Sequence, residues 1–359
     1  MTRVLVCLPR RFRFSPVNAT SIDLCTRDFV LHSRNKADTL VLAEHVEKPY
    51  DDVPLRLFPP GASKIGIARR IAAEAKLFDP DVVVVEQHFP TADLIRLFGV
   101  KVPVIVHTHN YGKPPANWLR RLAHRRRLAR LAGVVFVSRA AEDAFRKIWP
   151  DLGHLPAGVI HNGLDMALWH PAEKRVPEIL VVGRAEPAKG ILPAAEGIVA
   201  ALATRPDWRA RFILSEAPNG SGYLAAVRAA LAPLGARATV VTDQPFAVVK
   251  DANEHAAIAV IASDWEEPFG RTALEAHAGG AAVISSGRGG LREVSGDTAV
   301  YISAVTGPAI ATAISQLIDV PGRRDSLARA GLARARAEFD IRGQSAKLDA
   351  LIEARARHR

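Results

Sequence analysis

Two positively charged side chains follow an apolar, strand-like run in the second half of the sequence. The run Ile179–Val182 leads into Gly183 and Arg184, and Lys189 comes five residues later, just before a segment with helical periodicity. An arginine can bind two phosphate oxygens, a lysine adds a point charge, and a helix N-terminus offers free amide donors. This combination suits a diphosphate, although an ordinary strand–helix loop with surface cations would have the same sequence.

Two carboxylates lie at the start of another expected helix, within the segment Ser263–Gly280. Pro268 and Gly270 favour a turn, which places Glu267 in the loop before the helix and Glu275 just over one turn inside it. Carboxylates there can accept hydrogen bonds from vicinal hydroxyls of a sugar or ribose, and free N–H groups of the turn can bind a phosphate. Either glutamate alone would be common at the start of a helix, so the evidence for a binding site comes from the whole segment.

The elements that must position these residues alternate along the chain. Short runs rich in Val and Ile are each followed by a segment with helical periodicity, which is typical of β-α-β units and a parallel, doubly wound sheet. The pattern occurs twice, and a turn with a charged, Pro-containing stretch over residues 162–177 separates the two sets. We therefore expect an α/β protein with Rossmann-like domains over 1–170 and 171–340, and a terminal helix over 341–359 that packs on the first domain. Such domains would face each other across a cleft, because open parallel sheets bind ligands at the carboxyl ends of their strands.

The positive charge of the chain is concentrated in its first half. Residues 1–170 hold 25 Lys and Arg against 16 Asp and Glu, which is nine of the net charge of +11. The densest stretch, Trp118–Leu131, has apolar residues near helical spacing and reads as a basic amphipathic helix. Two interpretations stay open: a solvated helix, or attraction of Arg120–Arg130 to an anionic membrane surface. Nucleic acid is not expected, because no aromatic platform or known nucleic-acid module accompanies the charge.

Several classes of protein and site are not expected. The sequence shows no signal-peptide core and no run near the ~20 apolar residues that span a bilayer, so we expect a cytoplasmic protein, peripheral to the membrane at most. Cys7 and Cys25 have neither metal-ligand spacing nor the density of a disulfide scaffold. The D-x-D pattern Asp79–Asp81 precedes a strand, on the wrong side of a parallel sheet for a ligand. No other cluster has metal spacing along the sequence, so no metal is expected.

Taken together, the charged motifs resemble those of the retaining GT-B glycosyltransferases of family 4, also called group 1. The resemblance covers about residues 100–303, and the motifs occur in the family's order. It implies a GT-B fold and sugar transfer with retention at the anomeric carbon. The matching segments are Pro103–Asn110, Val159–Asp165, Gly183–Gly190, Glu267–Ala276 and Gly289–Val294.

The resemblance assigns the donor site to the second half of the chain. Arg184 and Lys189 match residues that bind the donor's diphosphate and stabilise it as it leaves. Glu267 matches the glutamate that holds hydroxyls of the transferred sugar, and Glu275 the one that binds the ribose. The implied donor-binding residues are Gly183, Arg184, Lys189, Glu267, Pro268, Phe269, Gly270, Arg271, Thr272 and Glu275.

In the first half, the resemblance points to a histidine that reaches the donor sugar or the acceptor. His109 is the best match and His107 is its competitor. The implied catalytic residues are therefore His109, Arg184, Lys189 and Glu267. The sequence departs from the family after Leu8, where many members have a glycine-rich loop and this chain has arginines that either reach an anionic acceptor or are simply exposed. The acceptor-side candidates are Arg10, Arg11, Arg13, His107 and Asn110.

The implied reaction moves a hexose-like unit from a nucleoside diphosphate sugar, expected to be a UDP-sugar, to an acceptor hydroxyl. No cofactor is expected beyond this co-substrate. A basic first domain and bacterial-looking Ala and Arg usage suggest a glycan or lipid-linked acceptor, in polysaccharide or lipopolysaccharide synthesis at the inner membrane face. Two alternatives stay open: a GT-B epimerase or hydrolase of nucleotide sugars, and a non-catalytic protein that binds nucleotide sugars.

Overall fold

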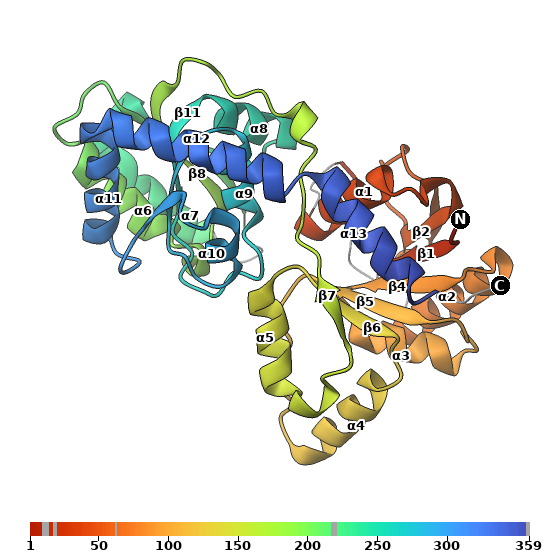
Figure 1. Ribbon diagram of the computed structural model, residues 1–359. Coiled ribbons are helices and arrows are strands. Elements are labelled where there is room, and N and C mark those ends of the chain that lie inside the picture. The colour runs from red at the N-terminus through yellow and green to blue at the C-terminus, as the bar shows by residue number, and fades with distance from the viewer. Residues whose placement is uncertain (9–13, 17–19, 62, 217–220, 357–359) are drawn as a thin grey trace. The chain divides into compact units, whose positions relative to one another are not determined.

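The chain folds into two compact units, seen in a computed structural model that describes residues 1–8, 14–16, 20–61, 63–216 and 221–356 (Figure 1). Unit 1 comprises Met1–Gly163 together with Ile341–Arg359, and unit 2 comprises Leu164–Asp340. The first boundary between the units, after Gly163, thus lies before the boundary at residue 170 that was expected from the sequence. The second boundary, after Asp340, lies where the sequence predicted it. Among the helices of the described ranges, none has both the length and the apolar composition needed to cross a membrane.

Unit 1 is built on a seven-stranded sheet in the order β3-β2-β1-β4-β5-β6-β7, in which every neighbouring pair is parallel. Its strands are β1 Val4–Cys7, β2 Thr39–Glu44, β3 Leu55–Phe58, β4 Val82–Glu86, β5 Val104–Thr108, β6 Gly133–Phe136 and β7 Pro156–Val159. Its helices are α1 Ser21–His32, η1 Lys36–Asp38, α2 Lys64–Phe78, α3 Phe89–Leu97, α4 Trp118–Leu128, α5 Arg139–Ile148, η2 Pro150–Leu152 and α13 Ile341–Glu353.

Both faces of this sheet are buried, which explains its almost entirely apolar central strands. Val83 and Val85 of β4 pack in one core, whereas Val82 and Val84 pack in a second core on the opposite face. This is the pattern expected of a parallel sheet covered by helices on both faces. The same alternation determines on which face of the sheet a polar residue at the end of a strand will lie.

The terminal helix α13 belongs to unit 1 because it packs beside α1 (Figure 1). The Asp349 carboxylate accepts hydrogen bonds from Ser33 Oγ at 2.7 Å and from the Arg34 N–H at 2.9 Å. Leu348 and Ile352 join the core beneath α1. The last segment therefore completes the unit with which the chain began.

Unit 2 is built on a six-stranded sheet in the order β10-β9-β8-β11-β12-β13, again parallel throughout. Its strands are β8 Val176–Arg184, β9 Arg209–Ser215, β10 Ala238–Thr242, β11 Ala256–Ile261, β12 Ala282–Ser285 and β13 Ala299–Tyr301. Its helices are η3 Met166–Leu168, η4 Pro187–Lys189, α6 Ile191–Leu202, α7 Ser221–Leu231, η5 Ala232–Arg237, α8 Phe246–His255, α9 Arg271–Ala278, α10 Gly290–Ser295, α11 Gly307–Asp319 and α12 Pro321–Glu338.

The two parallel sheets confirm the predicted α/β class. In each unit the strand order reverses at one place, between β1 and β4 in unit 1 and between β8 and β11 in unit 2. Ligands of doubly wound sheets bind beyond the carboxyl ends of the strands at such a reversal. The residues to inspect are therefore those that follow β8 and β11, and those at the ends of β4 and its neighbours.

Candidate functional site

The loop after β8 brings Lys189 toward the end of β11. Lys189 ends the short helix η4, and Gly190 follows it with a φ of 62° before α6 begins. A Cβ at Gly190 would lie 2.0 Å from the Ala262 carbonyl oxygen, so a side chain cannot fit between the loop and the end of β11. Glycine tolerates both the positive φ and the close contact. The sequence Lys189-Gly190 thus fixes the lysine beside the loop that follows β11.

Lys189 and Glu267, far apart in the sequence, form an ion pair in unit 2. Lys189 Nζ lies 2.6 Å from Glu267 Oε1, and Ser263 Oγ donates a hydrogen bond to the same oxygen. The two charged side chains are only 17% and 11% exposed, and they line a small recess with Gly183, Thr272 and neighbouring strand ends. We call Lys189, Ser263 and Glu267 the lysine cluster. It puts a cation and a carboxylate at the ends of β8 and β11.

The turn that holds Glu267 is supported from beneath by a second glycine motif. Gly290 N–H donates to the Glu267 carbonyl at 2.7 Å, and a Cβ at Gly290 would lie 2.6 Å from Phe269 Cα. Gly270 has a φ of 100° at the start of α9 and lies against Leu291. The pair Gly289-Gly290 therefore lets the start of α10 pack directly against the turn that contains Glu267. The two motifs, Glu267–Ala276 and Gly289–Val294, are thus parts of one packed unit.

The other predicted donor residues in unit 2 lie around this cluster in different ways. Arg271 Nε lies 2.8 Å from Glu275 Oε1 in the first turns of α9, and both side chains are largely buried. Arg184 is 54% exposed and pairs with Glu186 at 2.9 Å, outside the lysine cluster. The Phe269 ring packs edge-on against Phe339 in the core. Phe269 therefore offers its backbone to the site, while its side chain anchors the turn.

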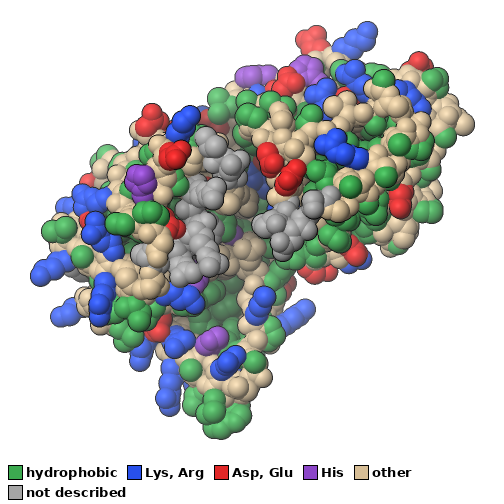
Figure 2. Space-filling view, turned by 180° about the vertical axis from the view of Figure 1, so that it is seen from behind, with side chains coloured by type: hydrophobic (Ala, Val, Ile, Leu, Met, Phe, Trp, Pro, Cys, Tyr) green, Lys and Arg blue, Asp and Glu red, His purple; other side chains and the backbone are tan. Residues whose placement is uncertain are grey.

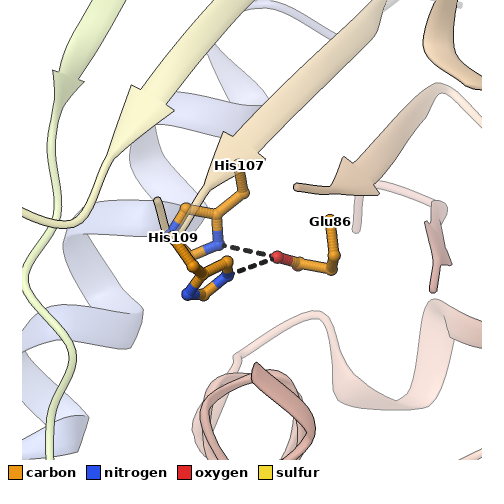
Figure 3. A group of neighbouring side chains, drawn as sticks. All are labelled: Glu86, His107 and His109. Atoms are coloured by element: carbon orange, nitrogen blue, oxygen red, sulfur yellow. Dashed lines mark hydrogen bonds and ion pairs between the residues drawn. The ribbon is translucent and has the colours of Figure 1, made fainter. Parts of the chain in front are cut away.

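Unit 1 has a second polar cluster, at the ends of β4 and β5 (Figure 3). The register pairs Glu86 with His107, and the period-two alternation puts His109 on the same face. Glu86 Oε2 lies 2.7 Å from His109 Nε2 and 3.2 Å from His107 Nδ1. All three side chains are buried. One carboxylate oxygen therefore holds both imidazoles.

The charge states of this cluster are coupled. Burial raises the pKa of Glu86, but the two histidines outweigh burial and lower that pKa to about 2, so the carboxylate is ionised. Burial, and then repulsion from His107, lower the pKa of His109 against the raising effect of Glu86. His109 is therefore a neutral imidazole near pH 7.

Gln87, directly after Glu86, holds the backbone of the same segment. Its φ is 62°, a left-handed conformation that is uncommon for a residue other than glycine. Its side-chain Oε1 accepts the N–H groups of His109 at 2.5 Å and Asn110 at 2.9 Å, and its own N–H donates to the His107 carbonyl at 2.7 Å. Glu86, Gln87, His107 and His109 form what we call the histidine cluster.

Sequence reasoning found the two histidines but missed Glu86 and Gln87. The expectation of no metal site considered only distances along the chain, whereas strand pairing brings ligand atoms of Glu86, His107 and His109 within 4.8 Å of one another. His107 packs edge-on against Phe29, and Asn110 is exposed. The candidates Arg10, Arg11 and Arg13 lie outside the described residues.

Comparisons with known proteins agree for both units. Residues 29–168 match the family model described as Glycosyltransferase Family 4, and residues 176–320 match the model described as Glycosyl transferases group 1. Glycogen synthase of Mycobacterium tuberculosis strain H37Rv is 31% identical over 188 residues, 51% of this chain and 44% of that protein. D-inositol 3-phosphate glycosyltransferase of Acidothermus cellulolyticus is 31% identical over 195 residues, 49% and 43% respectively. The match thus spans less than half the length of each of these relatives.

Solved structures resemble the whole chain. HepE of Anabaena in complex with UDP and glucose has a TM-score of 0.77 at 18% identity, and covers 99% of this chain and 100% of its own. A glycosyltransferase of Rickettsia africae has a TM-score of 0.79 at 15% identity, with 98% of both chains covered. At these identities, the likeness concerns the fold.

Proposed function

The chain belongs to the group 1, or family 4, glycosyltransferases and has their GT-B fold, and from this premise we propose that it transfers a hexose-like unit from a nucleoside diphosphate sugar to an acceptor hydroxyl. The observation that carries the proposal is the lysine cluster. It places a partly buried cation and a carboxylate side by side where a doubly wound sheet binds its ligand. A diphosphate needs the first group, and sugar hydroxyls need the second.

In this proposal the unit 2 residues divide the donor among them. Lys189 and Arg184 bind the diphosphate, and Lys189 remains between that anion and Glu267, so its charge is balanced on both sides. Glu267 accepts hydrogen bonds from hydroxyls of the transferred sugar. Glu275 accepts those of the ribose, while Arg271 keeps its carboxylate in one orientation.

We propose a front-face reaction with retention. The bond between the anomeric carbon and the diphosphate oxygen breaks, and the acceptor oxygen bonds to the same face of the sugar. The acceptor's proton passes to the departing phosphate oxygen. Negative charge grows on that phosphate as the bond breaks, so a fixed cation such as Lys189 stabilises the transition state more than the ground state.

The donor proposed here is a UDP-sugar, supported by the fold's likeness to HepE, which has been solved with UDP-glucose. The test is a screen of the purified chain with UDP-, GDP- and ADP-glucose and a panel of glycan and lipid-linked acceptors. Transfer predicts nucleoside diphosphate and glycoside in equal amounts. Free sugar alone would indicate a hydrolase, a new sugar nucleotide would indicate an epimerase, and binding without turnover would indicate a non-catalytic protein.

We also propose that helix α4 contacts an anionic membrane surface, which would present a lipid-linked acceptor. Its apolar side chains Trp118 and Leu119 are 71% and 59% exposed. On the face seen in Figure 2, hydrophobic side chains gather at the lower tip of unit 1, with Lys and Arg around them. Exposed apolar side chains combined with cations favour anionic lipid.

Two arginines of α4 have partners within unit 1: Arg125 pairs with Asp151, and Arg127 pairs with Asp93 at 3.2 Å. Co-sedimentation with anionic and neutral vesicles tests the proposal. Binding to the anionic vesicles alone supports it, and equal or absent binding to both contradicts it. The variant Trp118→Ser with Leu119→Ser should release the protein without changing transfer to a water-soluble acceptor.

A further inference from the structure

We propose that Glu86 and Gln87 are positioning residues that present His109 as a neutral imidazole, protonated on Nε2, whose Nδ1 accepts a hydrogen bond from a substrate hydroxyl. The identity of the substrate as a sugar or sugar acceptor rests on the proposed function. The state of the imidazole does not, because it follows from contacts inside unit 1.

The tautomer follows from the chemistry of the carboxylate. An ionised carboxylate only accepts hydrogen bonds, so a nitrogen that lies 2.7 Å from Glu86 Oε2 must carry a hydrogen. This nitrogen is Nε2 of His109. In a neutral imidazole the other nitrogen, Nδ1, then has a free lone pair. Figure 3 shows the second ring nitrogen of His109 turned away from Glu86.

The backbone of His109 is fixed as firmly as its ring. Gln87 accepts the main-chain N–H groups of His109 and Asn110 through one side-chain oxygen, and its own N–H binds the His107 carbonyl. It does so from a left-handed backbone conformation, which is strained for a residue other than glycine, and such strained residues cluster at functional sites. Two consecutive residues thus hold one histidine, the first by its ring and the second by its main chain.

The charge of the ring selects its ligand. Burial and repulsion from His107 both disfavour the imidazolium, so His109 does not offer a cation to a phosphate. A neutral nitrogen with a lone pair instead accepts from an O–H group. We infer that unit 1 contributes recognition of a hydroxyl, on the transferred sugar or on the acceptor, whereas the cations that meet phosphate lie in unit 2.

A metal ion bound by Glu86, His107 and His109 agrees less well with the structure than a substrate hydroxyl bound by His109. Histidines that ligate metals almost always donate their other N–H to a carboxylate, carbonyl or water, which fixes the ring. Nε2 of His107 is buried and has no hydrogen-bond partner among the described residues. In addition, both imidazoles contact the same oxygen of Glu86. The carboxylate is therefore the hydrogen-bond partner of both rings.

The deciding experiment is NMR of the full chain labelled with ¹⁵N-histidine, recorded from pH 6 to pH 8 and assigned with His109→Gln. The expected result is one neutral tautomer for His109, with hydrogen on Nε2. A Nδ1–H tautomer or an imidazolium at pH 7 would overturn the proposal, as would zinc in stoichiometric amount after purification. This result does not depend on whether the chain transfers sugar.

The variant Glu86→Gln keeps the shape of the side chain and removes its charge. We expect both tautomers of His109 to appear and kcat/KM for transfer to fall about 10- to 100-fold, by analogy with metal-ligating histidines that lose the group that orients them. In a His109→Gln background the same change should cost nothing further, because residues that act as a unit are not additive. Continued loss in that background would indicate a structural role and contradict the proposal.

Two further variants keep the test decisive. Glu74→Gln is the matched control, because Glu74 is a buried carboxylate of unit 1 that pairs with Arg56 and Arg70 instead of a histidine. It should leave both the His109 tautomer and transfer unchanged. If Glu86→Gln does not fold, Gln87→Ala takes its place, and it should leave the tautomer intact while lowering transfer.

Discussion

The lysine cluster of unit 2 and the histidine cluster of unit 1 are opposite solutions for a polar site at the end of a parallel sheet. Unit 2 pairs full charges of opposite sign in largely buried ion pairs, as in Lys189 with Glu267 and Arg271 with Glu275. Unit 1 buries one carboxylate under two imidazoles and leaves a neutral ring. A cation such as Lys189 suits a charged ligand, whereas a neutral ring suits a hydroxyl. The two clusters therefore contribute different chemistry to the proposed transfer.

The largest expected effect separates the clusters by charge. Lys189→Met keeps the length of the side chain but removes the cation that faces the departing diphosphate, so we expect kcat/KM to fall about 1,000-fold. Steady-state transfer of radiolabelled sugar measures this. Lys250→Met is the matched control, because Lys250 forms a similar ion pair with Glu254 at 2.7 Å within α8 and should have little effect. Equal losses in both variants would mean that the lysine cluster has no special role.

The next effect distinguishes binding from chemistry within unit 2. Glu275→Gln removes the charge that we assign to the ribose hydroxyls, and hydrogen bonds to a charged group contribute about 1.5–3 kcal/mol. We expect KM for the nucleotide sugar to rise at least tenfold with little change in kcat, since ribose contacts are the same in the ground and transition states. Titration calorimetry with UDP gives the same loss independently. A fall in kcat at constant KM would move Glu275 from binding to catalysis.

These two clusters differed in how far the sequence could predict them. Lys189 and Glu267 of the lysine cluster were singled out because each lies in a contiguous motif that spans one strand–loop–helix unit, such as Gly183–Gly190, whereas Ser263 and the ion pair itself were not predicted. The histidine cluster was only half predicted: Glu86 meets His107 through the register of β4 and β5, a contact between residues 21 apart that no local pattern encodes. Gln87 gave no signal at all, because glutamine is not among the residue types, such as glycine, asparagine and aspartate, that indicate a left-handed backbone.

The fold, too, was predicted where local sequence patterns determine it and missed where they do not. The apolar strands of both sheets were predicted from composition, because burial on two faces requires it. Strand β3 was not predicted, since Leu55–Phe58 is a short edge strand interrupted by a charged residue. The first segment of unit 1 ends at Gly163, before the boundary at residue 170 that we expected from the sequence. The difference arises because most of the Pro-containing stretch that looked like a linker already belongs to unit 2.

A smaller effect tests whether unit 1 stores strain for function. Gln87→Ala and Gln87→Gly both remove the acceptor of the His109 N–H, so each should lower kcat/KM about 3- to 10-fold. Only glycine accepts the φ of 62° without cost, so Gln87→Ala should be less stable than Gln87→Gly by about 1 kcal/mol. Urea unfolding measures that difference. Equal stabilities would mean that the left-handed backbone is not strained.

The smallest effect concerns a buried histidine of unit 2 that has no carboxylate among its described contacts. His277 lies in the core with Ser295 Oγ 3.0 Å from its Nε2, and Gly331 packs against its ring. Burial, and then repulsion from Arg334, lower its pKa to about 3. Below the ordinary value of 6.5, the unfolded chain binds a proton at this position and the folded chain does not, so stability decreases as the pH falls from 6.5 toward 3.

Replacement of His277 by Gln should remove this contribution. Between pH 7 and pH 5.5, wild-type stability should therefore fall about 1 kcal/mol more than that of His277→Gln, because each pH unit below 6.5 corresponds to about 1.4 kcal/mol for one fully uncoupled group. Urea unfolding at both pH values gives the difference. Parallel pH profiles would contradict the prediction and show that His277 accepts its proton in the folded chain. The neutral state of His109 would then depend on repulsion from His107 as well as on burial, because the neighbouring Glu86 carboxylate favours the charged ring.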